Sequence, residues 1–352
     1  MAGTHPLTPR PPRTRRTKNF WEPIYNPSTV ERFPYADWRT ACEHGATWKT
    51  LSSRDLSDVV QGGFFPKAKN VQFMSCDFFG SVETVVVFEN CKFLYCDFGL
   101  SAWRRAKFTN CEFNNTSFTQ CEFVECEFRG CDWISTGLSG NETRFDKTLI
   151  DNPEDFVDSA FLNIDDDILK SRGTNRDRQL VRFWETKSVV ARQLYNDLKS
   201  TGDEDSFYKA CKAFIQATCR YKFERAWRPG KRKDGIPHRK YTLRLISTIL
   251  EMGLIRLIAS INKWGESVIR PLLLLIACFI VFSVVYFGFG FESFHGSVRK
   301  SFEITSIAGY TRGAKVSPTF GLLLAEWLNL VSAIVFYTVF FSTIVSKICR
   351  VR

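Results

Sequence analysis

Residues 86–135 read VVFEN CKFLY CDFGL SAWRR AKFTN CEFNN TSFTQ CEFVE CEFRG CDWIS when they are written in blocks of five. The third residue of every block is Phe or Trp, and the first is small or compact: Cys, Ser, Thr, Ala or Val. A helix has a period of 3.6 residues and a strand a period of two, so neither produces this spacing. The period predicts a solenoid in which each block turns the same two side chains into a shared core.

The same period begins at Val71, is interrupted only at Glu83, and slips by two residues before Phe145 near its end at Ile150. This stretch resembles the pentapeptide-repeat family. The resemblance implies a right-handed quadrilateral β-helix in which four blocks form one turn, so that about 16 blocks form about four coils stacked about 4.8 Å apart.

Cysteine is concentrated in this repeat, because seven of the 12 Cys occupy the first position of a block. No Cys-x-x-Cys pair occurs, and no His lies in the repeat. We therefore expect these thiols to pack in the core as small apolar side chains rather than bind a metal or a cofactor.

Some pentapeptide-repeat proteins mimic duplex DNA, which requires a strongly acidic face. Residues 71–150 carry 11 acidic and seven basic residues, so no nucleic-acid partner is expected.

Two apolar stretches near the C-terminus predict membrane spans. Pro271–Gly290 has 20 residues without a charge, and Thr319–Ser346 is interrupted only by Glu326 and Asn329 as strongly polar residues. Residues 220–270 hold 13 Lys and Arg, whereas the loop 291–318 holds four. The positive-inside rule then predicts a multi-pass membrane protein with both termini in the cytoplasm and the connecting loop outside. An aromatic content of 15% excludes a wholly disordered chain.

The sequence thus predicts a multidomain membrane protein, and the helical pattern of residues 189–228 predicts an α-helical hairpin as the linker. This hairpin is either an interaction module or a spacer that closes the end of the β-helix. The expected parts are a disordered basic arm (1–20), an N-terminal cap region (21–70), the repeats (71–150), a cytoplasmic helical domain (152–230), a basic segment with an interfacial helix (231–269), the first span (270–290), a pore helix with a filter loop (291–318), the second span (319–346) and a basic tail (347–352).

The segment before the first span is strongly basic, which favours contact with anionic lipid headgroups. Residues 241–265 are apolar but carry Glu251 and Arg256 near their middle, so an interfacial helix is favoured over a third span. The expected headgroup ligands are Arg228, Lys231, Arg232, Lys233, Arg239 and Lys240.

Between the spans the chain reads SFEITSIAGYTRG over residues 301–313. The order of the expected elements is a span, a short helix, a Gly-Tyr turn and a second span. This order resembles the two-transmembrane pore domain of the potassium-channel superfamily, which has a re-entrant loop. The junctions around residues 263–267 and 325–328 resemble those of bacterial proteins that fuse pentapeptide repeats to such a pore. The resemblance implies a selectivity filter. In such a filter, the backbone carbonyls of an extended loop replace the hydration shell of the ion. The filter positions are Ile307, Ala308, Gly309, Tyr310 and Thr311, supported by Glu303, Arg312 and Glu326.

Three departures from the potassium-channel pattern weaken the expectation of potassium selectivity. Ile307 lacks a hydroxyl, Thr311 replaces a glycine, and Arg312 places a cation at the outer mouth. We therefore expect a homotetrameric, weakly selective pore for monovalent cations, with a β-helix that senses or scaffolds a cytoplasmic ligand or protein. The alternatives are a membrane-anchored scaffold without conduction and a triggered effector that depolarises the membrane. The four His are scattered and no catalytic motif is present, which predicts that the chain is not an enzyme.

Overall fold

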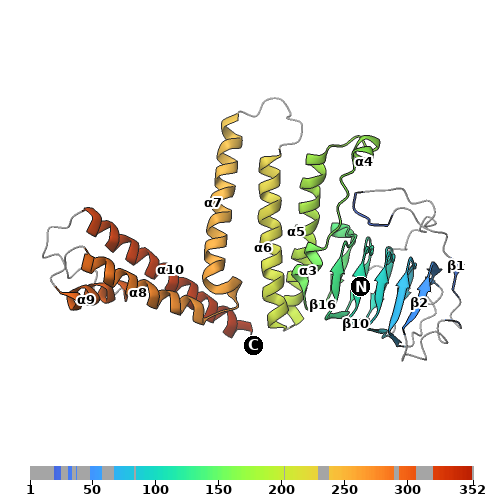
Figure 1. Ribbon diagram of the computed structural model, residues 1–352, viewed down its shortest axis with the longest axis horizontal. Coiled ribbons are helices and arrows are strands. Elements are labelled where there is room, and N and C mark those ends of the chain that lie inside the picture. Colours follow the sequence, from blue (N-terminus) through green and yellow to red (C-terminus); the bar gives the residue numbers. More distant parts are fainter. Residues whose placement is uncertain are drawn as a thin grey trace. The chain divides into compact units, whose positions relative to one another are not determined.

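The chain folds into two compact units in a computed structural model, Met1–Ile249 and Leu250–Arg352, and each is described by itself (Figure 1). The residues that the structure describes are 20–24, 31–33, 37, 48–57, 67–82, 85–201, 203–228, 238–288, 293–306 and 320–350. The first unit contains a β-solenoid followed by helices, and the second is helical.

Parallel strands form three sides of the solenoid. The first sheet contains β2 (Lys49–Ser52), β5 (Val71–Met74), β8 (Lys92–Leu94), β11 (Glu112–Asn114) and β14 (Asp132–Ile134). The second contains β4 (Ala68–Lys69), β7 (Val87–Glu89), β10 (Lys107–Thr109), β13 (Glu127–Arg129) and β16 (Leu149–Ile150). The third contains β6 (Gly80–Val82), β9 (Ser101–Arg104), β12 (Glu122–Val124) and β15 (Arg144–Asp146). The fourth side is formed by single parallel bridges at Asp55, Asp77, Asp97, Ser117 and Gly137, and β1 (Glu31–Arg32) pairs with β3 (Arg54–Asp55).

The register of these sheets confirms the five-residue period. Phe93 pairs with Phe113 and Phe113 with Trp133, so each coil consumes four blocks of five. The two-residue slip is also confirmed, because Phe123 pairs with Phe145, two residues beyond the position that four blocks of five would give. The short helix η2 (Gly140–Glu142) lies between them in the sequence. The interruption at Glu83 has a simple cause: Val82 pairs with Trp103, so this side of the coil is shifted by one residue.

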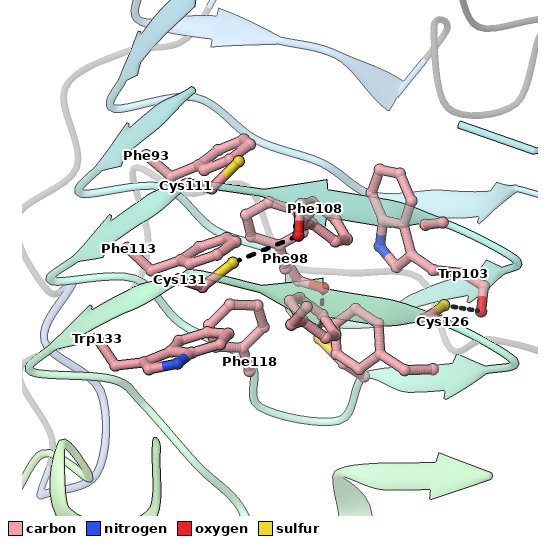
Figure 2. Close-up of a cluster of buried hydrophobic side chains, with 14 of the residues drawn as sticks. Phe93, Phe98, Trp103, Phe108, Cys111, Phe113, Phe118, Cys126, Cys131 and Trp133 are labelled. Atoms are coloured by element: carbon pink, nitrogen blue, oxygen red, sulfur yellow. Dashed lines mark hydrogen bonds between the residues drawn. The ribbon is translucent and has the colours of Figure 1, made fainter. Parts of the chain in front are cut away.

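Stacked aromatic rings fill the interior of the solenoid. Phe113 is fully buried, and its ring lies 4.8 Å from that of Phe93 and 4.6 Å from that of Trp133, nearly parallel to both. Figure 2 shows this column with Cys111 and Cys131 beside it. Stacking in this way lets each coil bury its rings against the coil before and the coil after it.

Buried thiols and hydroxyls satisfy backbone carbonyls of the preceding coil. The Cys131 thiol donates to the carbonyl of Phe108 at 3.5 Å, and the Thr116 hydroxyl donates to the carbonyl of Phe93 at 3.0 Å. Figure 2 marks the Cys131 contact. This explains why the first position of a block accepts Cys and Thr alike, since both are compact and carry a donor.

The last residue of most blocks turns the corner in the left-handed backbone region. Asn90, Asn110 and Asn115 have φ between 50° and 53°, and Gly130 has φ 60° at the equivalent corner. Asn tolerates this region better than most residues with a side chain, and Gly adopts it without steric cost. A Cβ at Gly130 would lie 2.5 Å from the Asn110 Oδ1 atom, so a larger residue at this corner would displace the end of the Asn110 side chain.

The solenoid begins before Val71, within the range that the sequence analysis assigns to a cap region (21–70). Leu51 in β2 pairs with Phe73, and the buried Ala68 in β4 pairs with Phe88. Of the basic arm (1–20), only Phe20 belongs to the described residues, and it packs against Ile168 and Leu169.

Helices close the C-terminal end of the solenoid (Figure 1). They are α3 (Pro153–Asp158), α5 (Arg176–Thr201) and α6 (Glu204–Trp227), and α5 and α6 form the expected hairpin. The short α4 (Asp166–Ser171) lies between α3 and α5 in the sequence. Val190 and Leu194 of α5 are fully buried and join the same core as the stacked rings. The Asp197 carboxylate accepts the backbone amides of Lys147 and Thr148, the latter at 2.7 Å. Burial raises the pKa of Asp197, and these two hydrogen bonds oppose that rise.

Three of the described helices are long and apolar enough to cross a membrane, where the sequence analysis expects two. The additional candidate is Leu243–Gly265, within α7 (His238–Asn262) and the turn η3 (Lys263–Gly265). Leu and Ile dominate the residues around Glu251 and Arg256, so this stretch is apolar enough to be a candidate despite the two charges. The other candidates are α8 (Ile269–Gly288) and most of α10 (Phe320–Arg350), separated by the short α9 (Phe294–Thr305).

Candidate functional site: the helices α8, α9 and α10

The short helix α9 packs against the two long apolar helices α8 and α10 (Figure 1). Ser293 precedes it as the N-cap, and its hydroxyl accepts the amide of Gly296 at 3.1 Å. Its last turn is closed by the amide of Ser306, which donates to the carbonyl of Phe302 at 2.8 Å. At about 1.5 Å per residue, its 12 residues span about 18 Å, which is too short to cross a membrane.

An ion pair joins α9 to α10. The Lys300 ammonium lies 3.0 Å from a carboxylate oxygen of Glu326, and their side chains are only 10% and 14% exposed. The neighbouring Ser301 hydroxyl donates to the carbonyl of Phe279 in α8 at 2.9 Å. Adjacent residues of α9 therefore hold it to both long helices.

A second polar contact lies one turn further along α10, at Asn329. Its amide oxygen accepts the Thr305 hydroxyl at 3.1 Å and lies 3.9 Å from the Cys278 sulfur. Its amide nitrogen donates to the Tyr286 hydroxyl at 3.2 Å. The Asn329 side chain is fully buried, so these contacts replace water around an amide that would otherwise be costly to bury.

Apolar side chains surround this polar cluster. Tyr286 of α8, Ile304 of α9 and Ala325 of α10 are buried together, and Phe282 and Leu330 pack against them. The contact region between the three helices thus combines apolar packing with hydrogen bonds, which is the usual way in which helices associate inside a membrane.

Glu303 and Glu326 were both expected to support a filter, and the structure gives them different partners. Glu303 contacts Arg299 of its own helix at 2.9 Å, whereas Glu326 reaches α9 through Lys300. The filter positions 307–311 and Arg312 lie outside the described residues.

Arg228, one of the expected headgroup ligands, joins α6 to α5. Its guanidinium lies 2.6 Å from the Glu224 carboxylate and also pairs with Asp177. The carboxylate of Asp177, followed by that of Glu224, raises the pKa of Arg228 above its ordinary value. Lys231, Arg232 and Lys233 lie outside the described residues, and Arg239 and Lys240 belong to the first turn of α7 with side chains that are not described.

Sequence reasoning did not identify Asn329, Thr305 and Tyr286 as a group. Asn329 is visible as a polar residue in an otherwise apolar stretch, and this is a useful signal in a membrane helix. Its partners could not be read from the sequence, because they are 24 and 43 residues away and depend on how the helices pack.

Comparison with protein families matches residues 104–132 to the model described as pentapeptide repeats (8 copies). No curated protein matches the chain. The match falls on the central coils of the solenoid, from β9 to β14. The chain therefore carries a pentapeptide-repeat β-solenoid, followed by a helical region with three helices long and apolar enough to span a membrane.

Proposed function

We propose that the chain forms a homotetrameric channel for monovalent cations in the cell (inner) membrane, with a β-solenoid that senses or scaffolds a cytoplasmic partner. In this proposal α8 and α10 are the spans, α9 is a re-entrant pore helix, and the carbonyls of residues 307–311 coordinate the permeating ion. The observation that carries the proposal is a helix too short to cross the membrane that is held to α8 and α10 and ends four residues before the Gly309-Tyr310 pair of the sequence.

The electrostatics of α9 support a cation as the permeating ion. A helix carries a partial negative charge at its C-terminal end, and α9 ends at Thr305, two residues before Ile307. Four such ends around one axis would favour a cation at the loop. Arg312 opposes this field, which agrees with weak rather than strong selectivity.

The large apolar side chains on the outer faces of α8 and α10 support contact with lipid or with further copies of the chain. Leu273 and Ile280 of α8 and Phe341 and Val345 of α10 are each more than half exposed in the single chain. Monomeric soluble proteins rarely expose apolar faces of this extent. A tetramer in a bilayer would bury part of each face between subunits and the rest against acyl chains.

The proposed topology places both termini in the cytoplasm, which requires α7 to lie along the membrane surface. Arg244, Ser247 and Glu251 of α7 are exposed and fall on one helical face, as expected for an interfacial helix. A reporter that is active on only one side of the membrane, fused after residue 230 or after residue 268, distinguishes the two arrangements. Equal activity at both sites supports the interfacial helix, whereas opposite activity places α7 across the membrane.

The channel proposal is tested by recording purified protein in planar bilayers. The wild-type chain should give discrete unitary currents, and Gly309→Ala or Tyr310→Ala should change their size. Gly253→Ala is the matched control, because a Cβ at Gly253 meets no atom within 4 Å. Currents that are the same in all four proteins would remove the loop from the conduction path.

Subunit stoichiometry separates the channel from its main rival, a membrane-anchored solenoid scaffold. Cross-linking or native mass spectrometry in detergent should give four copies per particle. A monomer without conductance would favour the scaffold, since a tether has no need to assemble. A tetramer whose induction in cells collapses the membrane potential would favour a triggered depolarising effector.

A further inference from the structure

The end of the α5–α6 hairpin at which α5 begins and α6 ends carries an excess of positive charge. Residues 176–185 and 220–228, which form this basic end, hold seven Lys and Arg against three Asp and Glu. Two of these acidic residues, Asp177 and Glu224, already pair with Arg228. The short α4 before α5 carries one net negative charge, so it does not cancel the excess. The exposed cations of the basic end are Arg176, Arg178, Arg182, Arg220, Lys222 and Arg225.

Aromatic rings and a cation are packed in series along the basic end. The Arg220 guanidinium lies 5.5 Å from the ring centroid of Trp184 and 5.6 Å from that of Phe223. The Phe223 ring stacks on the ring of Trp227 at 6.0 Å, nearly parallel to it. Trp227 is the last residue of α6 and is 59% exposed. The series therefore finishes in a large amphipathic side chain on the surface.

Contacts between the two helices bring cations of both onto one face. Arg178, Arg182 and Glu185 follow one another at spacings of four and three residues, so they lie on one stripe of α5. The Glu185 carboxylate accepts the Tyr221 hydroxyl of α6, and the Arg225 guanidinium donates to the same hydroxyl. The stripe of α5 thus adjoins Arg225, and folding rather than a local basic run creates this face.

The position of Trp227 in the chain favours a lipid surface as the partner of this face. The chain from Trp227 to His238, where α7 begins, can span at most about 40 Å even if it were fully extended. In either arrangement of α7, across the membrane or along its surface, the helix begins close to the membrane. Trp beside Lys and Arg is typical of protein surfaces at the membrane boundary, where the ring enters the headgroup region and the cations meet phosphates. A nucleic acid would be attracted by the same charges, but the short connection to α7 gives it no advantage.

We infer that the basic end of the hairpin docks on an anionic lipid surface, with Trp227 in the headgroup region and Lys222 and Arg225 beside lipid phosphates. The inference rests on the proposed entry of the apolar helices into a membrane, and it does not depend on conduction. It adds a folded surface of α5 and α6 to the lipid contacts expected for the basic segment before the first span.

Photo-cross-linking of the full chain in vesicles tests this contact. Benzoylphenylalanine in place of Trp227 is a bulky aromatic residue at an exposed position, so it should leave the fold intact. In vesicles of phosphatidylcholine and phosphatidylglycerol, irradiation should attach lipid at position 227, and mass spectrometry gives the fraction of protein that carries lipid. In phosphatidylcholine alone we expect this fraction to be about tenfold lower, because the exposed cations then meet no net negative surface.

Charge variants separate the basic end from the charge of the whole chain. Lys222→Gln together with Arg225→Gln should lower the fraction labelled at position 227 about tenfold in the anionic vesicles. Arg104→Gln together with Arg105→Gln is the matched control, because it removes the same charge from exposed positions of the solenoid. Gln fits the corner at Arg105, since Gln120 has nearly the same φ. This control should leave the fraction within about twofold of the unmodified charge.

Two further positions for benzoylphenylalanine keep the inference separate from the proposed function. Trp48 is 54% exposed and lies beside Lys92, and it should carry almost no lipid. Ile280 of α8 is 56% exposed in a candidate span and should carry lipid if α8 enters the membrane. More lipid at 227 than at 48 supports the inference even if the protein passes no current.

Lipid at position 280 with no more at 227 than at 48 overturns the inference while leaving α8 in the membrane. Equal fractions at 227 in the two kinds of vesicle also overturn it, because the cations would then have no role. The same holds if position 227 cross-links to nucleic acid carried through purification, or to a second copy of the chain, instead of to lipid.

Discussion

The stacked ring of Phe113 gives a direct measure of how strongly one coil stabilises the next. Phe113→Ala removes a fully buried ring that lies between two parallel rings, at 4.8 Å and 4.6 Å. Truncation of a buried Phe costs about 3–5 kcal/mol, and each aromatic pair contributes about 0.5–1.5 kcal/mol beyond its buried area. With two such pairs lost, we expect a decrease of about 4–5 kcal/mol in the free energy of unfolding of the solenoid.

Phe145→Ala is the matched control, because Phe145 lies in the last coil and is only partly buried. Its ring stacks against one other ring, that of Phe123 at 5.7 Å, and meets the ring of Phe156 edge-on at 5.6 Å. We expect a decrease of about 1–3 kcal/mol for this variant. Denaturant unfolding of the full chain in detergent, followed by near-ultraviolet circular dichroism, measures both values. A cost for Phe145→Ala equal to or above that of Phe113→Ala would refute the reasoning that internal stacking stabilises the solenoid.

Three further predictions test the remaining contacts. Asp197→Ala should lower the free energy of unfolding of the first unit by about 1–3 kcal/mol, because two backbone amides of the last coil lose their acceptor; denaturant unfolding measures the change. Burial raises the pKa of the Cys126 thiol to about 12, so at pH 8 an alkylating reagent should modify the exposed Cys349 at least tenfold faster, as mass spectrometry of the labelled peptides would show. Lys300→Met should cost about 3 kcal/mol in thermal unfolding by leaving the carboxylate of Glu326 buried without this partner, and adding Glu326→Gln should restore part of the loss.

The solenoid was largely predictable because its information is local. Every block of five repeats the same inward pair, so the period, the buried Phe and Cys positions and the two-residue slip before Phe145 all follow from the sequence and are confirmed. The shift that puts Val82 opposite Trp103 was not predictable, because a change of one residue at a corner shows itself only in the pairing between coils. The early coil at Leu51 was missed for a similar reason, since the regular aromatic spacing starts only at Val71.

The helical region was predictable in outline and not in its contacts. Apolar stretches reveal α8 and α10, but composition alone did not decide whether the charges of α7 exclude it as a span, and α7 proved long and apolar enough to be a third candidate. The pairing of Glu326 with Lys300 and of Asn329 with Thr305 depends on the packing of α9, which no local pattern encodes. Arg228 shows the same limit, because a basic residue beside a basic segment turned out to contact two carboxylates.

Ion flux into vesicles that contain the purified full-length protein tests the central claim most directly. Vesicles loaded with K⁺, Na⁺ or Cl⁻ and diluted into a solution without the permeant ion should release K⁺ and Na⁺ at rates within about tenfold of each other, as weak discrimination between them requires. They should release Cl⁻ no faster than protein-free vesicles do. Release of Cl⁻ alone, or no release above that of protein-free vesicles by protein shown to be tetrameric, would contradict a cation pore formed by α8, α9 and α10.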